Sequence, residues 1–205
     1  MRIDQFRHKP FLGILRGIEP GAVEPLVESV LATALPAIEI TMNTAGAADL
    51  IRQAVRVGRG RLSVGAGTVL SRQDLDAALD AGAQFIVSPT LVREVVEACV
   101  ARRTPVFPGA FTPQEIYDAH LAGATMVKVF PAKFFGPAYL EEIKGPFQDI
   151  ELLACGGVAP HNVRAFFASG ASAVAFGGSI FRPDWLEAGE FDKIRQAIDA
   201  LIDAA

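Results

Sequence analysis

The chain contains 205 residues, of which 51% are hydrophobic and only 20% are charged. Its longest uncharged stretch, 165–181, spans 17 residues with three glycines and three serines, which is too short and too rich in small residues to predict a membrane-spanning helix. The formal net charge of −4, from 19 basic and 23 acidic residues with no basic run, argues against a nucleic-acid partner. The same composition excludes intrinsic disorder and favours a parallel α/β fold, whose strands are buried on both faces.

Short apolar runs alternate with longer amphipathic segments from the N-terminus to the C-terminus. Most runs end at or beside glycine, proline or serine, as fully buried strands do. The runs predict eight strands, at 11–17, 37–42, 63–69, 85–89, 105–110, 126–131, 150–157 and 173–179. The intervening segments predict eight helices, at about 20–34, 45–57, 72–81, 91–102, 113–122, 137–144, 160–168 and 190–203.

Local signals support this alternation. Thr112 to Glu115 reads as a helix start, with an N-cap, a proline at the first helical position and a capping-box glutamate, and Ser71 is a weaker cap. A short motif of small residues around Gly82, Gly123 and Gly170 ends a predicted helix each time and leads directly into the next strand.

Eight strand-and-helix units of roughly 25 residues each fill the chain, which predicts a single-domain (β/α)8 TIM barrel over residues 1–205 with parallel strands. A doubly wound open sheet is the alternative. It is disfavoured because the units are regular and no GxGxxG fingerprint is present.

Cysteine and histidine usage predicts neither disulfides nor a metal site. Cys99 and Cys155 stand alone in apolar surroundings without CxxC spacing, which is typical of reduced thiols in a cytoplasmic protein. The three histidines are scattered and lack ligand-like spacing, so we expect no metal and no cofactor.

Three charged residues lie inside predicted strands, where a charge is costly unless it has a use: Arg16, Glu39 and Lys128. Strand parity places Lys128 on the opposite face from Val127 and Val129. If the valines face the helices, the amine projects into the barrel lumen, where desolvation and a cationic neighbour such as Arg16 would favour the neutral form that attacks a ketone.

Glu39 could relay protons in Schiff-base formation and hydrolysis. The alternative for both residues is a buried structural ion pair between Lys128 and Glu39. Lys133 and Lys144 fall in a loop and a helix, and we expect them to be solvated.

Glycine pairs end the last two predicted strands. Gly156-Gly157 and Gly177-Gly178-Ser179 would let a ligand approach free backbone N–H groups, and the loops after strands seven and eight are the usual phosphate site of this barrel class. The alternative is that these glycines only make tight turns.

The chain resembles the 2-keto-3-deoxy-6-phosphogluconate (KDPG) aldolases, a family that includes 4-hydroxy-2-oxoglutarate and phosphogalactonate (KDPGal) enzymes. The resemblance runs from about residue 12 to residue 202. It is carried by LRG at 15–17, IEIT at 38–41, GAGTVL at 65–70, VSP at 87–89, FPGAFT at 107–112, VKVFPA at 127–132, GGV at 156–158 and GGS at 177–179.

The resemblance implies a class I, metal-independent aldolase that yields pyruvate and glyceraldehyde 3-phosphate, and a homotrimer. The residues that it implies are Lys128 for the Schiff base, Glu39 for acid–base catalysis, Arg16, Thr68, Pro89 and Phe130 for substrate, and Gly157, Gly177, Gly178 and Ser179 for phosphate. We also expect Gly156, of the same glycine pair, at the phosphate site and Asn43 at the substrate site.

Asn43 marks a departure, because phosphogluconate members commonly have an arginine there. Asparagine at this position, together with FGP at 135–137, resembles the phosphogalactonate branch. Two other classes remain open: a sugar-phosphate epimerase or isomerase on the same fold, and a non-catalytic phosphosugar-binding barrel.

Overall fold

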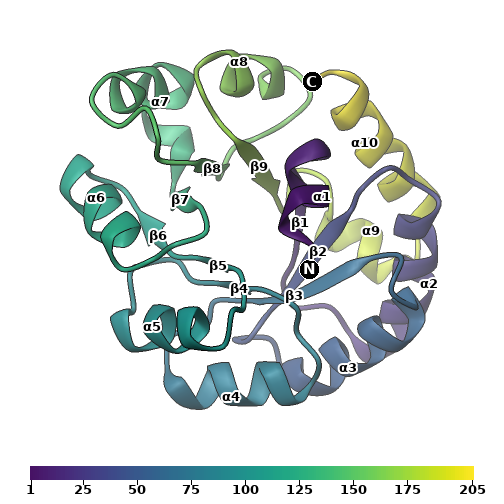
Figure 1. Ribbon diagram of the computed structural model, residues 1–205. Coiled ribbons are helices and arrows are strands. Elements are labelled where there is room, and N and C mark those ends of the chain that lie inside the picture. Colours follow the sequence, from purple (N-terminus) through teal and green to yellow (C-terminus); the bar gives the residue numbers. More distant parts are fainter.

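The computed structural model describes residues 1–205 as a ring of parallel strands enclosed by helices (Figure 1). The strands are β1 (Phe11–Leu15), β2 (Ala37–Thr41), β3 (Ser63–Gly67), β4 (Ile86–Val87), β5 (Val106–Phe107), β6 (Gly109–Ala110), β7 (Val127–Val129), β8 (Leu152–Cys155) and β9 (Ala173–Phe176). The main helices are α2 (Pro20–Leu31), α3 (Ala47–Gly58), α4 (Arg72–Asp80), α5 (Arg93–Ala101), α6 (Pro113–Leu121), α7 (Gly136–Lys144), α8 (Val163–Ala168) and α10 (Phe191–Asp203). The predicted (β/α)8 barrel is confirmed.

The fifth predicted strand is split in two, so nine strands are formed instead of eight. The sheet order is β5-β4-β3-β2-β1-β9-β8-β7-β6, and Pro108 alone separates its first and last members. Proline has no N–H to donate to a ladder, so pairing breaks at this residue. Its carbonyl still accepts from the Lys128 amide at 2.9 Å. The sheet therefore closes into a barrel through one continuous stretch of chain.

Other differences from the sequence predictions lie at the ends of the elements. Every strand is shorter than predicted. At the carboxyl ends of β4, β8 and β9 the reason is that the glycine, proline and serine residues counted in the runs belong to the loops that follow. The helix predicted from 160 begins at Val163, because the Asn162 side chain accepts from the Ala159 amide and holds a turn before it. Three short helices were not predicted: α1 (Ile3–His8), the 3-10 helix η1 (Ala132–Phe134) and α9 (Pro183–Glu187).

The predicted start and stop signals are confirmed. Thr112 and Glu115 form a reciprocal capping box at the start of α6, and the Ser71 hydroxyl accepts from the Asp74 amide at the start of α4. The glycines of the repeated turn motif all have left-handed backbones, with φ between 92° and 98°. Each therefore occupies a conformation that few other residues adopt readily.

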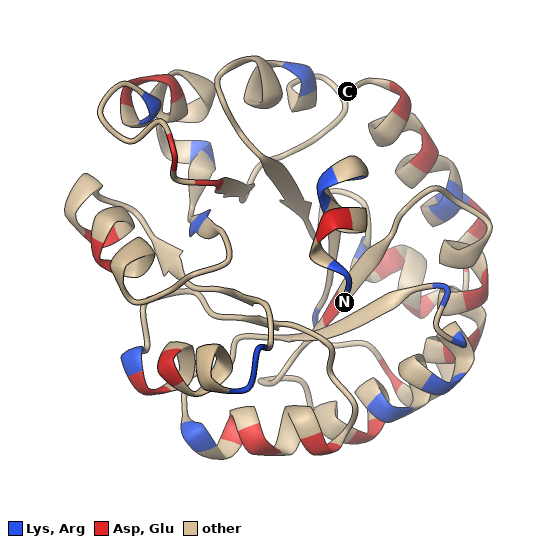
Figure 2. Cartoon of the chain, in the orientation of Figure 1, with Lys and Arg blue, Asp and Glu red and all other residues tan.

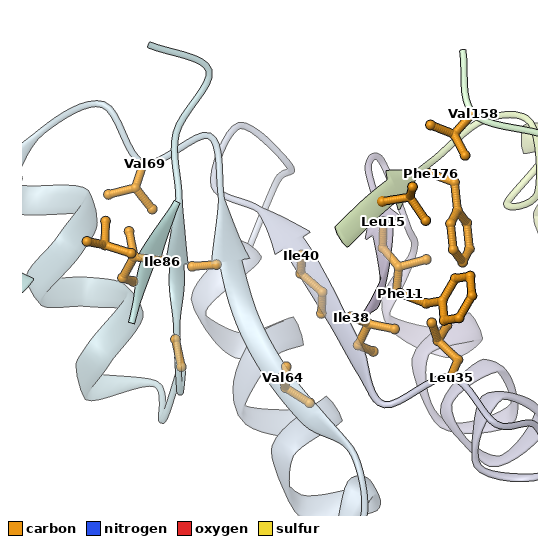
Figure 3. Close-up of a cluster of buried hydrophobic side chains, with 14 of the residues drawn as sticks. Phe11, Leu15, Leu35, Ile38, Ile40, Val64, Val69, Ile86, Val158 and Phe176 are labelled. Atoms are coloured by element: carbon orange, nitrogen blue, oxygen red, sulfur yellow. The ribbon is translucent and has the colours of Figure 1, made fainter. Parts of the chain in front are cut away.

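Two separate apolar cores show which way each strand residue points. The larger core, of 50 buried residues, lies between the strands and the helices and includes Val127 and Val129. Figure 3 shows part of it, with Ile38 and Ile40 among the residues labelled. The smaller core fills the barrel lumen with 11 buried residues, including the largest lumen side chains, those of Phe6, Phe85 and Phe107. Alternate strand residues thus serve different cores, as the pleat requires.

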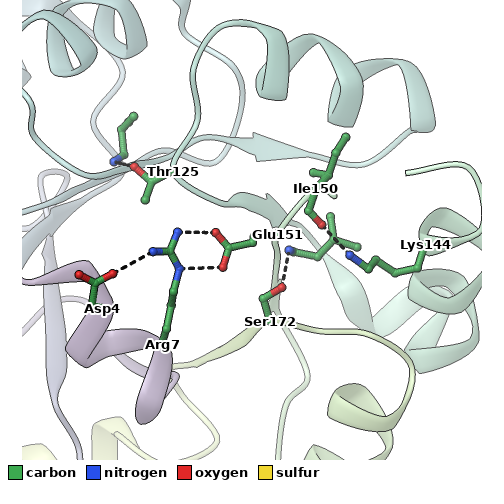
Figure 4. Close-up of polar contacts among 9 residues, drawn as sticks. Asp4, Arg7, Thr125, Lys144, Ile150, Glu151 and Ser172 are labelled. Atoms are coloured by element: carbon green, nitrogen blue, oxygen red, sulfur yellow. Dashed lines mark hydrogen bonds and ion pairs between the residues drawn. The ribbon is translucent and has the colours of Figure 1, made fainter. Parts of the chain in front are cut away.

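Helix α1 covers the N-terminal opening of the barrel (Figure 1), and Phe6 projects from it into the lumen core. Arg7 binds Glu151, at the start of β8, through two hydrogen bonds of 2.9 and 2.7 Å, and also contacts Asp4 (Figure 4). The exposed ion pair contributes little by itself, so burial of Phe6 is the main attachment of α1. Helix α1 thus occupies the end of the barrel opposite to the carboxyl ends of the strands.

Charged side chains lie mainly on the outer helices and the loops, while the strands are almost free of them (Figure 2). No helix combines the length and the hydropathy needed to cross a membrane.

Candidate active site

Lys128 is the middle residue of β7 and is 6% exposed. Its neighbours Val127 and Val129 belong to the outer core, whereas Met126 belongs to the lumen core. Lys128 therefore points into the lumen, which is the orientation that parity required. Its Nζ lies 5.1 Å from the centroid of the Phe130 ring, two residues further along the same face.

Glu39 occupies the equivalent place on β2, between Ile38 and Ile40, and is 1% exposed. Neither carboxylate oxygen has a hydrogen bond within the protein, and Oε2 is fully enclosed without a partner. Burial raises the pKa of this carboxyl above its ordinary value, and the positive charges of Lys128 and Arg16 oppose the shift. A carboxyl that holds its proton at higher pH is suited to donating and recovering it.

Gly67 makes the space for this carboxylate. A Cβ at Gly67 would lie 2.7 Å from the Glu39 Cδ and 3.2 Å from its Cγ, and closer still to Oε1. The Glu39 Cα is paired with Gly65 in the ladder, and its side chain leans along the strand to rest on Gly67. The absence of a side chain on β3 thus determines where the acid sits.

The structural ion pair considered from the sequence is not formed. All ion pairs join side chains that are at least 31% exposed, and none includes Lys128 or Glu39. The two buried groups influence each other electrostatically but remain free to act on a third molecule.

A cavity of 510 Å³ opens at the carboxyl ends of β7, β8, β9 and β1. Seven of the predicted site residues line it: Arg16, Phe130, Gly156, Gly157, Gly177, Gly178 and Ser179. Lys128 and Glu39 do not line this cavity themselves, but Phe130, over which the Lys128 ammonium lies, does. The cavity thus reaches the immediate neighbourhood of the buried lysine.

The glycine loops that line this cavity contain unused hydrogen-bond donors. The amides of Gly156, Gly157, Gly177, Gly178 and Ser179 donate to no backbone or side-chain acceptor. The Ser179 hydroxyl, in contrast, donates to the Val158 carbonyl at 3.0 Å. A ring of free amides is a common way to hold an anionic group.

Three predicted substrate residues lie at the same end of the barrel but outside this cavity. Thr68 follows β3 with a left-handed backbone (φ 55°), and Pro89 follows β4; both are half-buried. Asn43 is exposed in the turn after β2. In that turn the Thr44 hydroxyl accepts from the Gly17 amide at 3.0 Å, which ties the Asn43 loop to the loop that carries Arg16.

Sequence reasoning missed several cavity residues. Cys155 lies in β8, is 2% exposed and lines the cavity, and burial raises the pKa of its thiol. Lys133 is exposed, as expected, but it also lines the cavity, as does Phe181. Cys155 could have been predicted to face the lumen, because it lies two residues after the lumen residue Leu153 on the same strand. No local signal marked Lys133.

A second cavity of 380 Å³ adjoins the first and shares Arg16 and Pro183 with it. It lies between the start of α2 and helix α9, and two carboxylates, Glu19 and Glu187, line it. The guanidinium of Arg16 thus stands at the boundary between an acid-free cavity and an acidic one.

Comparison with known proteins gives consistent matches over most of the chain. The family model for KDPG and KHG aldolase matches residues 3–197. A probable 2-dehydro-3-deoxy-6-phosphogalactonate aldolase of Rhizobium meliloti (strain 1021) is 32% identical over 96% of this chain and 92% of its own length. A KHG/KDPG aldolase of Escherichia coli (strain K12) is 34% identical over 88% of this chain and 85% of its own.

Solved structures agree with these relatives. A native KDPGal structure superimposes with a TM-score of 0.89 at 32% identity, covering 95% of this chain and 93% of the other. A cube-shaped protein cage, designed by fusing symmetric oligomeric domains, matches with a TM-score of 0.88 at 32% identity, over 95% of this chain and 71% of the cage chain.

Proposed function

The chain belongs to the KDPG and KHG aldolase family and is an aldolase, a carbon–carbon lyase, and from that premise we propose that Lys128 and Glu39 are its catalytic residues. The proposed reaction cleaves a 2-keto-3-deoxy-6-phosphosugar acid to pyruvate and glyceraldehyde 3-phosphate. The observation that carries this proposal is the burial of an unpaired lysine and an unpaired carboxyl in the barrel lumen, beside a cavity lined by free amides.

In the proposed mechanism, the neutral Lys128 amine attacks the C2 ketone of the substrate to give a carbinolamine. Glu39 donates a proton to the departing hydroxyl, which leaves as water, and a protonated imine remains. The imine accepts the electron pair of the C3–C4 bond while the C4 hydroxyl gives up its proton. This step releases the aldehyde and leaves an enamine, which is protonated at C3 and hydrolysed to pyruvate and free Lys128.

We propose that the remote phosphate binds at the loops after β8 and β9, through the amides of Gly156, Gly157, Gly177, Gly178 and Ser179. Binding there positions the C3–C4 bond over Lys128 without entering the chemistry. Arg16 and Phe130, which line the same cavity, would complete the substrate site together with Thr68, Pro89 and Asn43 at its edge.

We also propose that the protein is a homotrimer. Phe134 and Phe135 are 67% and 59% exposed, and Phe135 stacks on Phe111 with ring centroids 5.2 Å apart. Large exposed aromatic groups of this kind are typical of a contact surface, and we assign it to a second copy of this chain. The oligomeric domains named for the cage structure support that choice. A one-domain organisation over residues 1–205 and a cytoplasmic location stay predictions of the sequence.

Borohydride reduction in the presence of pyruvate tests the mechanism. We expect a stable pyruvyl adduct on Lys128, located by peptide mass spectrometry, with no adduct and no turnover in Lys128→Met. Lys9→Met is the matched control, because Lys9 is exposed near the opposite end of the barrel. An adduct on a different lysine, or turnover by Lys128→Met, would overturn the assignment. Full activity after treatment with EDTA is expected, because no step uses a metal.

A non-catalytic phosphosugar-binding barrel would bind phosphate and form no adduct in the same experiment. An epimerase or isomerase would turn over its sugar phosphate without releasing pyruvate. Neither alternative explains the two buried, unpaired groups in the lumen.

A further inference from the structure

The lining of the 510 Å³ cavity is positively charged. Two cations, Arg16 and Lys133, line the cavity, and no carboxylate does. Neither cation takes part in any ion pair, although eight ion pairs form elsewhere on this chain of net charge −4. Two unpaired cations in the lining of a cavity that has no carboxylate indicate that the cavity binds an anion.

Lys133 is fixed close to the glycine loop that follows β8. It is the middle residue of η1, and a Cβ at Gly157 would lie 2.6 Å from the Lys133 Cβ and 3.4 Å from its Cα. The lysine stem therefore starts directly on that loop. Gly157 has a left-handed backbone (φ 82°), so both its conformation and this close approach require glycine.

The ammonium of Lys133 is held without being neutralised. Its Nζ lies 5.4 Å from the centroid of the Phe134 ring, and the Lys133 side chain forms no hydrogen bond or ion pair within the protein. A contact with an aromatic face leaves the full charge of the ammonium and all three of its donors available. A rotation of the flexible stem brings the group towards the cavity that the residue already lines.

We propose that Lys133 is a second cationic ligand for the phosphate of the substrate, beside Arg16 and the free amides of Gly157 and Gly178 that line the same cavity. This inference rests on the proposed function. Two cations and several N–H donors match the charge and the acceptor oxygens of a phosphate monoester dianion better than one cation does. Lys133 is a binding residue and takes no part in the bond-breaking steps at Lys128.

The experiment compares Lys133→Met with the control Lys9→Met, which removes the same charge far from the cavity. KM and kcat are measured with a 2-keto-3-deoxy-6-phosphosugar acid and with 4-hydroxy-2-oxoglutarate, which has no phosphate. We expect Lys133→Met to raise KM for the phosphorylated substrate about tenfold, the effect of losing one charge-assisted contact, with kcat nearly unchanged. In Lys133→Met, inhibition by inorganic phosphate should weaken by a similar factor. Lys133→Arg, which keeps the positive charge, should restore most of the affinity for the phosphorylated substrate and for phosphate.

Each outcome separates this inference from the proposed function. If the wild-type protein forms the pyruvyl adduct but Lys133→Met keeps the wild-type KM and phosphate inhibition, the inference is wrong and the proposed function stands. If the wild-type protein forms no adduct, the proposed function fails, and weaker binding of inorganic phosphate by Lys133→Met, measured by calorimetry, still supports the inference. An equal rise in KM for both substrates would assign Lys133 to a carboxylate and overturn it.

Discussion

The Glu39 carboxylate fits in its place only because residue 67 is a glycine and has no Cβ. The variant Gly67→Ala, which adds a single methyl group, tests this. In Gly67→Ala, the new Cβ would overlap the carboxylate, lying only 2.7 Å from the Glu39 Cδ. Ordinary contacts begin near 3.4 Å, so the Glu39 Cδ must move by about 0.7 Å, and Oε1, which lies closer to the new Cβ, must move further. The backbone of Gly67 is not left-handed, so alanine introduces no conformational strain of its own.

A shift of that size at a group that moves protons is expected to lower kcat by roughly 10²-fold. The loss of stability should be small by comparison, about 1–2 kcal/mol, since a terminal carboxylate can swing aside and alanine restricts the unfolded chain. Steady-state kinetics and urea unfolding measure the two effects separately. Gly58→Ala is the control, because its Cβ would meet its nearest neighbour at an ordinary 3.5 Å.

A double variant makes the reasoning sharper. If Gly67→Ala acts through the Glu39 carboxyl, adding it to Glu39→Gln should lower kcat no further, because the two changes remove the same function. Wild-type kcat in Gly67→Ala, or a full additional loss in the double variant, would refute the argument that Gly67 positions this acid.

Three other perturbations test separate parts of the molecule. Because burial raises the folded-state pKa of Glu39, the contribution of this carboxyl to stability is complete below its ordinary value of 4.5 and is lost as pH rises through the raised pKa. The stability of Glu39→Gln relative to wild type should therefore increase between pH 5 and pH 8, as measured by urea unfolding at both values; a difference that stays constant with pH would contradict this. Phe6→Ala should cost about 3–5 kcal/mol in urea unfolding without changing kcat, and a loss below about 1 kcal/mol would mean that α1 adds little to the lumen core. Thr44→Val removes the acceptor of the Gly17 amide, so KM should rise several-fold at constant kcat; an unchanged KM would show that the Arg16 loop does not need this bond.

Parity explains why the reacting groups could be predicted from the sequence. Lys128 stands between Val127 and Val129, and Glu39 between two isoleucines, so each has one orientation that buries its neighbours against the helices. The order of the elements followed from the same alternation of apolar runs and amphipathic segments. Strand parity and the order of the elements depend on residues that are close in the sequence, so they can be predicted from one sequence alone.

The features that could not be predicted depend on contacts between distant segments. The role of Gly67 follows from the register of β2 against β3, and no property of residue 67 alone indicates it. Helix α1 reads as a polar segment, because Phe6 is its only buried residue. Lys133 carries no signal, since a charge in a loop is ordinary; only its approach to Gly157 reveals its place at the cavity.

The reacting groups and the recognition groups stand on different parts of the barrel, and this separation bears on substrate choice. Lys128 and Glu39 lie on strands that are paired on both sides, so changes beside them disturb the ladder as well as the chemistry. Arg16, Asn43 and Lys133 lie beyond the strand ends, where a substitution alters the cavity and leaves the barrel intact. Relatives named for the galactonate and the gluconate substrates accordingly match this chain at similar identity, 32% and 34%. Overall similarity is therefore a poor guide to the preferred sugar acid, and the loop residues around the cavity are the place where that preference must be decided.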